Sequence, residues 1–129
     1  EYIQYRLERS FELLEDAKLL AQNERWRSCV NRLYYSCFQL VNALLFVDNI
    51  TPKSHNGLKT KFFQLYLKPG IIDPEEGMTY AKLLDWRQES DYSVYVDFTK
   101  EDVFPMIEAV ERFNLVVTDL IKEKTENPY

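Results

Sequence analysis

A polar stretch at residues 87–95 holds an arginine, an aspartate and two tyrosines. Arg87 offers a planar guanidinium fork that matches the geometry of a phosphate group, and the rings of Tyr92 and Tyr95 can stack on nucleobases. A structural interpretation is equally concrete, because Arg87 and Asp91 are four residues apart and can form an ion pair along one helix face. The stretch is therefore either a binding site for phosphate or nucleic acid, or a helix end held by a salt bridge.

His55 is the one histidine of the sequence and lies at an expected helix start. A phosphate-binding or RNA-binding role is supported by Lys53, Lys59 and Lys61 nearby and by the positive end of the helix dipole. The alternative is a structural or solvent-facing histidine at a helix N-terminus. Both interpretations of His55 stay open at this point.

Metal and cofactor chemistry finds little support in the sequence. A di-iron helical bundle needs paired Glu-x-x-His motifs, and Cys29 and Cys37 with one histidine cannot supply the four ligands of a structural zinc site. We expect both cysteines to be buried, reduced thiols. A glycine-rich loop that could cradle phosphates is missing as well, so we expect neither a metal nor another cofactor.

Composition indicates a packed globular chain with an acidic surface. Hydrophobic residues make up 46% and aromatic residues 15% of the 129 residues, which predicts one domain over residues 1–129 with a real core. The net charge of −5 is opposite to that of a dedicated nucleic-acid binder. We therefore expect no DNA binding, and RNA binding would need a local basic patch. No apolar run is long enough to span a membrane.

Apolar residues at spacings of three and four predict two long N-terminal helices, over about residues 2–24 and 26–47. The second carries two adjacent apolar stripes, so we expect it to be central in the fold. Its polar positions then need partners; they are Asn31, Arg32, Tyr35, Gln39 and Asn42.

Capping signals predict the remaining helices. Ser54 caps a third helix that ends at Pro69-Gly70, and Asp73-Pro74 starts a fourth. Helical periodicity fades between residues 89 and 98, and a capping box at Thr99 starts a fifth helix, which Pro105 is expected to kink or delay. The tail from about residue 123 is expected to fray. The expected inward residues of the third and fourth helices are Leu58, Phe62, Leu65, Tyr80, Leu83 and Leu84.

These features predict an all-α fold, an antiparallel bundle of four to five helices. A small bundle with a long aromatic-rich helix often shares a face with a second copy, so a homodimer is expected. Three segments in this order carry a resemblance to a known family. They are Asn31-Arg32-Leu33-Tyr34-Tyr35-Ser36-Cys37-Phe38, Ser54-His55-Asn56-Gly57-Leu58, and Leu84-x-x-Arg87-x-x-x-Asp91-Tyr92.

The sequence resembles the HEPN family, and within it the small stand-alone prokaryotic members with an arginine–aspartate–tyrosine motif. The resemblance implies a homodimeric bundle of about five helices in the cytoplasm. It also implies a neighbouring minimal nucleotidyltransferase, often as a toxin–antitoxin pair. Many members are metal-independent ribonucleases. Their arginine and a histidine, separated by about four to six residues, meet at the dimer cleft for phosphate stabilisation and acid–base chemistry.

Here Arg87 matches the family arginine, but Tyr92, Ser93 and Val94 occupy the window of the histidine. No side chain in that window titrates near neutral pH. We therefore expect a protein without an intact ribonuclease motif, which binds a nucleotide, an RNA or a partner nucleotidyltransferase. The candidate binding residues are Arg87, Asp91, Tyr92, Tyr95, His55 and Lys59.

Two alternatives remain. One is a ribonuclease toxin that uses Arg87 with His55 or a tyrosine. The other is a structural dimerisation or adaptor bundle, in which Arg87 and Asp91 form a salt bridge and nothing more. In related pairs the transferase modifies a tyrosine of the motif, and the resemblance implies Tyr92 as the corresponding position.

Overall fold

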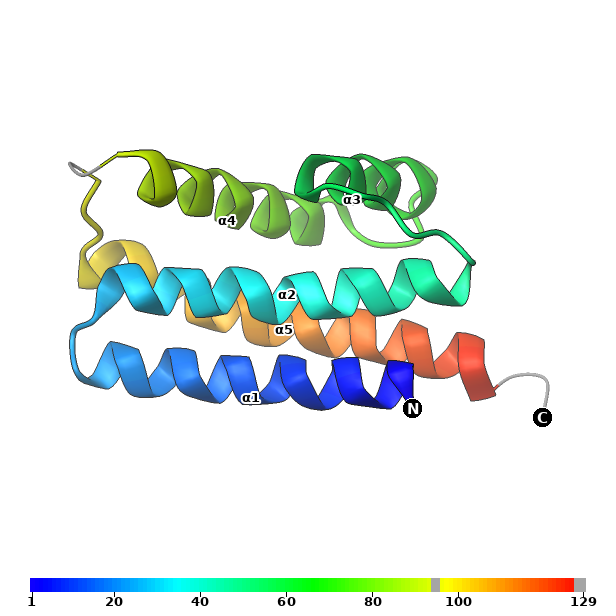
Figure 1. The fold of residues 1–129 in the computed structure, drawn as a ribbon, viewed down its shortest axis with the longest axis horizontal. Coiled ribbons are helices and arrows are strands. Elements are labelled where there is room, and N and C mark those ends of the chain that lie inside the picture. Colours follow the sequence, from blue (N-terminus) through cyan, green and yellow to red (C-terminus); the bar gives the residue numbers. More distant parts are fainter. Residues whose placement is uncertain (94–95, 127–129) are drawn as a thin grey trace.

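The second helix, α2 (Trp26–Val47), is the central element of the computed structural model, which describes residues 1–93 and 96–126. Helix α1 (Tyr2–Gln22) runs antiparallel beside it, α5 (Lys100–Glu126) packs behind both, and α3 (His55–Phe62) and α4 (Pro74–Tyr92) cover the opposite side of α2 (Figure 1). The described residues contain no strand. The predicted all-α antiparallel bundle is thus confirmed, with five helices.

Both apolar stripes of α2 are buried, as the sequence predicted. Leu33, Tyr34, Leu44 and Leu45 have no exposed surface, and burying each such side chain contributes about 1.5–3 kcal/mol. Cys29 also lies in this core as a free thiol, and burial raises its pKa to about 11. Cys37 is free and buried as well, so the expectation of two buried, reduced cysteines is confirmed.

Side-chain caps fix two of the helix starts. The Ser54 hydroxyl accepts a hydrogen bond from the Gly57 backbone N–H at 2.9 Å. At α5, Thr99 and Asp102 bond each other's backbone N–H groups at 3.0 and 3.2 Å, which is a reciprocal capping box. Because this cap sets the start of α5 at Lys100, Pro105 lies inside the helix, and the delay considered for that residue does not occur.

The third helix changes character after Phe62. It continues as a π-helical segment, η1 (Phe63–Leu67), in which Tyr66 is the buried residue and Leu65 is partly buried. Leu65, the residue expected to face inward, packs against the core while partly exposed, and Tyr66, four residues after Phe62, is the fully buried position. The Tyr66 hydroxyl donates to Asp48, which also pairs with Lys124 at 3.3 Å. This segment is therefore tied to the ends of α2 and α5.

The end of α4 lies further along the chain than the loss of periodicity suggested. The helix continues to Tyr92, so the last turn carries Asp91 and Tyr92. Arg27, from the first turn of α2, donates hydrogen bonds to the carbonyls of Ser90, at 3.3 Å, and Val96. These contacts join the first turn of α2 to the last turns of α4 and to Val96.

Two further expectations concern the tail and the membrane. Residues 123–126 belong to α5, and residues 127–129 lie outside the described part of the chain. Within residues 1–93 and 96–126, no helix is both long and apolar enough to cross a bilayer.

Candidate functional site

Arg87 lies on α4 with its guanidinium group over two rings of α2. Its Cζ is 5.6 Å from the centre of the Tyr34 ring and 5.7 Å from that of Tyr35. Nη2 pairs with Oδ2 of Asp91 at 3.3 Å, and the Arg87 side chain is 18% exposed. The guanidinium of Arg87 therefore lies against two aromatic rings, and part of the side chain is exposed to solvent.

The ion pair alone does not explain why Arg87 is buried to this extent. A partly exposed pair at this spacing contributes about 0.3–0.5 kcal/mol. The Arg87 Nε is buried without a hydrogen-bond partner among the described residues, and such a group costs about 1–3 kcal/mol. The cost exceeds the gain from the pair, which makes Arg87 a candidate functional residue beside its role in the salt bridge.

His55 is the first residue of α3 and packs against the same part of α2. Its ring centre lies 4.8 Å from that of Phe38 and 5.6 Å from that of Tyr34. Its Nδ1 and the Tyr34 hydroxyl oxygen are 2.6 Å apart, a hydrogen-bond distance. Tyr34 therefore contacts both His55 and Arg87, and the structure brings these two residues to one site.

The electrostatic surroundings favour a neutral His55. Burial lowers the pKa of His55, the positive charge of Arg87 lowers it further, and Asp91 acts in the opposite direction. A neutral imidazole can accept a proton at one nitrogen. If Nδ1 carries the hydrogen and donates it to Tyr34, the lone pair lies on Nε2, for which no hydrogen bond is found among residues 1–93 and 96–126.

Tyr34 supports this arrangement through the contact of its hydroxyl with Nδ1 of His55. The residue is fully buried, and burial raises the pKa of its hydroxyl to about 12. Tyr34 and Tyr35 were not among the predicted site residues. The available signal was Tyr35, one of the polar positions of α2 that need partners in a central helix.

The other predicted site residues have different surroundings. Tyr92 is 88% exposed on the last turn of α4. Lys59 lies one turn after His55, with its Nζ 5.8 Å from the centre of the Phe63 ring. Tyr95 lies outside the described residues. Arg87 and Asp91 of α4 and His55 of α3 therefore form the centre of the candidate site. Tyr92 lies at the end of α4.

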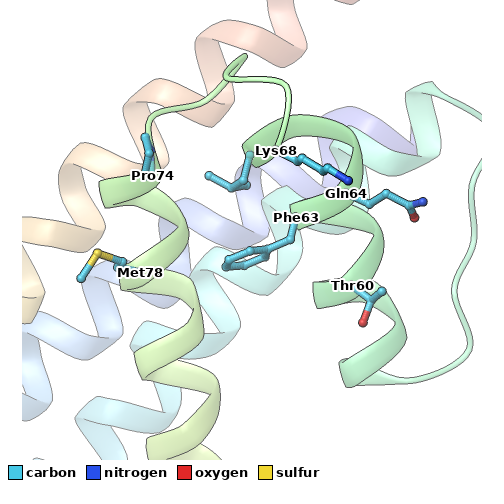
Figure 2. A pocket seen from close by; sticks show the side chains of 7 residues that line it. Thr60, Phe63, Gln64, Lys68, Pro74 and Met78 are labelled. Carbon is cyan, nitrogen blue, oxygen red and sulfur yellow. The ribbon is translucent and has the colours of Figure 1, made fainter.

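Two hollows of the structure differ in chemistry. A hollow of about 120 Å³ adjoins His55 and is lined by Lys53, Ser54 and Asn42 among others. A larger one, of about 650 Å³, lies between η1 and the start of α4, where Phe63 and Met78 approach from the two elements (Figure 2). Its lining contains Lys68 but no carboxylate, histidine or cysteine. The groups suited to phosphate chemistry therefore lie at the Arg87–His55 site and not in the larger hollow.

Within the described ranges, no three histidine, cysteine or acidic side chains gather closely enough to hold a metal ion. The groups of the site that can take part in binding or catalysis are its arginine, its histidine and its tyrosines. A guanidinium can bind a phosphate, and a neutral imidazole can exchange a proton.

Comparison with known proteins places this site in a family context. The family model described as the HEPN domain matches residues 3–120. A Thermotoga maritima protein named UPF0332 protein is 36% identical over 121 residues, covering 94% of this chain and 92% of the relative. A Methanocaldococcus jannaschii protein named "putative toxin" is 32% identical over 123 residues, covering 95% and 91%. A second protein of that archaeon with the same designation is 31% identical over 96 residues.

Proposed function

The chain belongs to the HEPN domain family, and from this premise we propose that it is the toxin-like member of a two-protein pair and binds RNA at Arg87. Two archaeal relatives with toxin in their names support the first part. The observation that carries the second part is the guanidinium of Arg87, held over Tyr34 and Tyr35 beside His55. A phosphate of the RNA would take the place of Asp91 at the guanidinium, or share it.

Growth on expression in bacteria tests this proposal. We expect the wild-type chain to arrest growth and Arg87→Met, which keeps the apolar stem but removes the charge and every donor, to relieve the arrest. Arg25→Met is the matched control, because Arg25 is an exposed arginine at the turn between α1 and α2. Arrest of equal strength by wild type and Arg87→Met, at equal protein levels, would remove Arg87 from the function.

We further propose that the chain forms a homodimer and binds a minimal nucleotidyltransferase. The family resemblance supports both, and the 88% exposure of Tyr92 makes its hydroxyl accessible to a modifying enzyme. In such a modification the phenol oxygen bonds to the α-phosphorus of a nucleoside triphosphate, pyrophosphate leaves, and the phenol proton passes to solvent. Intact-mass measurement after co-expression with the transferase should show added nucleotide, absent in Tyr92→Phe.

RNA cleavage is the second candidate function, and the position of His55 favours it. In this step Nε2 of His55 takes the proton of a ribose 2′-hydroxyl, and the 2′ oxygen bonds to the adjacent phosphorus. The bond from phosphorus to the 5′ oxygen breaks, and that oxygen takes a proton from water. The products are a 2′,3′-cyclic phosphate and a 5′-hydroxyl, and Arg87 stabilises the charge on the pentacoordinate phosphorus.

The two candidate functions differ in their dependence on His55. Binding alone needs Arg87, whereas cleavage needs both residues. If the chain cleaves RNA, His55→Gln should abolish cleavage of a labelled oligoribonucleotide while binding persists. Cleavage at the wild-type rate in His55→Gln would exclude this mechanism, and cleavage products ending in a simple 3′-phosphate from the start would exclude the 2′-oxygen route.

A further inference from the structure

A polar groove is lined in part by Tyr35, the tyrosine whose ring lies under the guanidinium of Arg87. It has a volume of about 310 Å³, and its lining consists of Arg9, Leu13, Asn31, Arg32, Tyr35 and Gln39. These residues come from α1 and α2, which lie side by side in Figure 1, with α4 on the far side of α2. Because Tyr35 lines the groove and also carries the guanidinium of Arg87 over its ring, the groove and the Arg87–His55 site share a wall.

Arg32 in the groove lining and Arg6, which bonds to the lining residue Gln39, have neutral partners. Nη1 of Arg32 donates to Oδ1 of Asn31 at 2.7 Å, and Nη1 of Arg6 donates to Oε1 of Gln39 at 2.8 Å. Neither makes an ion pair with a carboxylate in the part of the chain that the structure describes. Arg9 is the exception, since it pairs with Glu12 at 3.2 Å.

Some cations elsewhere in the described residues are paired with carboxylates. Lys18 pairs with Glu111 at 2.8 Å, and Arg112 pairs with the buried carboxylate of Glu76 at 3.1 Å. The chain as a whole carries a charge of −5. Arg32 in the groove and Arg6, bonded to the groove residue Gln39, have no carboxylate partner among the described residues, and their positive charges favour an anionic ligand on this face of an acidic protein.

The dimensions of the groove suit a strand with several phosphates. Residues 31, 35 and 39 follow one another at single helical turns along α2, and from Arg32 to Gln39 the helix rises about 10 Å. A nucleic-acid strand in a duplex advances about 3.4 Å per nucleotide, so the groove has the length of roughly two to three nucleotides. A charged groove with an aromatic side chain in its wall is typical of single-strand binding.

We propose that this groove binds the backbone of single-stranded RNA that continues from the phosphate at Arg87. Arg32 and Arg6 contact successive phosphates, and Tyr35 lies against the nucleotide between them and Arg87. The ligand is then an RNA strand of several nucleotides and not a free mononucleotide. This inference rests on the proposed RNA binding at Arg87 and extends it to a second set of residues.

Arg32→Gln tests the groove, because glutamine keeps a donor for Asn31 but loses the charge. Arg25→Gln is the matched control. Binding of a fluorescent eight-nucleotide single-stranded RNA is measured by anisotropy over a series of salt concentrations. We expect Arg32→Gln to lower the affinity for the octamer about tenfold. The slope of the logarithm of the binding constant against the logarithm of salt concentration should become less steep by about 0.7, the value for one phosphate contact in a single strand. A labelled mononucleotide should bind both variants equally, and Arg25→Gln should behave as wild type.

Several outcomes would contradict the proposal that this groove binds RNA. They are equal octamer affinities for Arg32→Gln and Arg25→Gln, an equal loss for octamer and mononucleotide, equal affinity of the wild type for a duplex of the same length, and no octamer binding by the wild type. Light scattering measures the oligomeric state of each variant. If Arg32→Gln changes the oligomeric state as well as weakening RNA binding, Arg32 is an interface residue and the proposal is contradicted. If Arg87→Met retains octamer binding and Arg32→Gln loses it, the proposed RNA binding at Arg87 is contradicted, whereas RNA binding in the groove is supported.

Discussion

Replacing Arg87 by methionine separates a functional arginine from a structural one. The substitution removes the pair with Asp91, about 0.3–0.5 kcal/mol, and the contacts with the rings of Tyr34 and Tyr35, about 0.5–2 kcal/mol. It also removes the buried, unpartnered Nε, which costs about 1–3 kcal/mol in the wild type. Because these contributions oppose each other and are of similar size, the free energy of unfolding should change by less than about 2 kcal/mol.

Urea denaturation followed by circular dichroism measures this change, with Arg25→Met as the control for loss of one exposed charge. A functional arginine then shows a clear loss of RNA binding at nearly unchanged stability, a combination common at sites selected for activity. Destabilisation by more than about 2 kcal/mol, with RNA binding unaffected, would contradict the reasoning and identify Arg87 as part of a structural bundle.

Three other predictions concern pH, packing and the end of α4. The pKa of His55 is lowered in the folded state. The contribution of this residue to stability is therefore complete above the unfolded pKa of about 6.5 and declines as the pH falls. Between pH 7.5 and pH 5, urea denaturation should show a smaller loss of unfolding free energy for His55→Gln than for wild type. A Cβ at residue 77 would lie 2.9 Å from Leu67, so Gly77→Ala should cost about 1–3 kcal/mol and lower Tm, and an unchanged Tm would mean that η1 moves aside freely. Arg27→Gln removes the hydrogen bonds to Ser90 and Val96 and should speed amide exchange in the last turn of α4, whereas protection equal to wild type would show that these bonds are dispensable.

Much of the fold was predictable because it is local in sequence. The bounds of α2 follow from a periodic apolar pattern, and the start of α5 follows from the Thr99–Asp102 capping box. The π turn of η1 was not predictable from periodicity, because it depends on packing against α4, where Gly77 leaves room for Leu67. The end of α4 was also missed, because its last turn is held partly by Arg27 from another helix.

The candidate site divides in the same way. Arg87 and Asp91 are neighbours on one helix, so their pairing could be expected from a spacing of four residues. The contact between His55 and Tyr34 joins residues 21 positions apart and depends on how α3 docks on α2. The motif of α4 lacks a histidine, but the docking of α3 on α2 places His55 beside Arg87 from another helix. Sequence spacing alone does not reveal this arrangement.

Equilibrium binding of the single-stranded RNA octamer to wild type and Arg87→Met, at one fixed salt concentration, tests the central claim most directly. A charge-assisted hydrogen bond is worth about 1.5–3 kcal/mol, so the dissociation constant for Arg87→Met should rise by at least about tenfold, with Arg25→Met unchanged. Equal dissociation constants for wild type and Arg87→Met, with both proteins folded, would contradict the assignment of Arg87 as the RNA-binding centre of this HEPN protein.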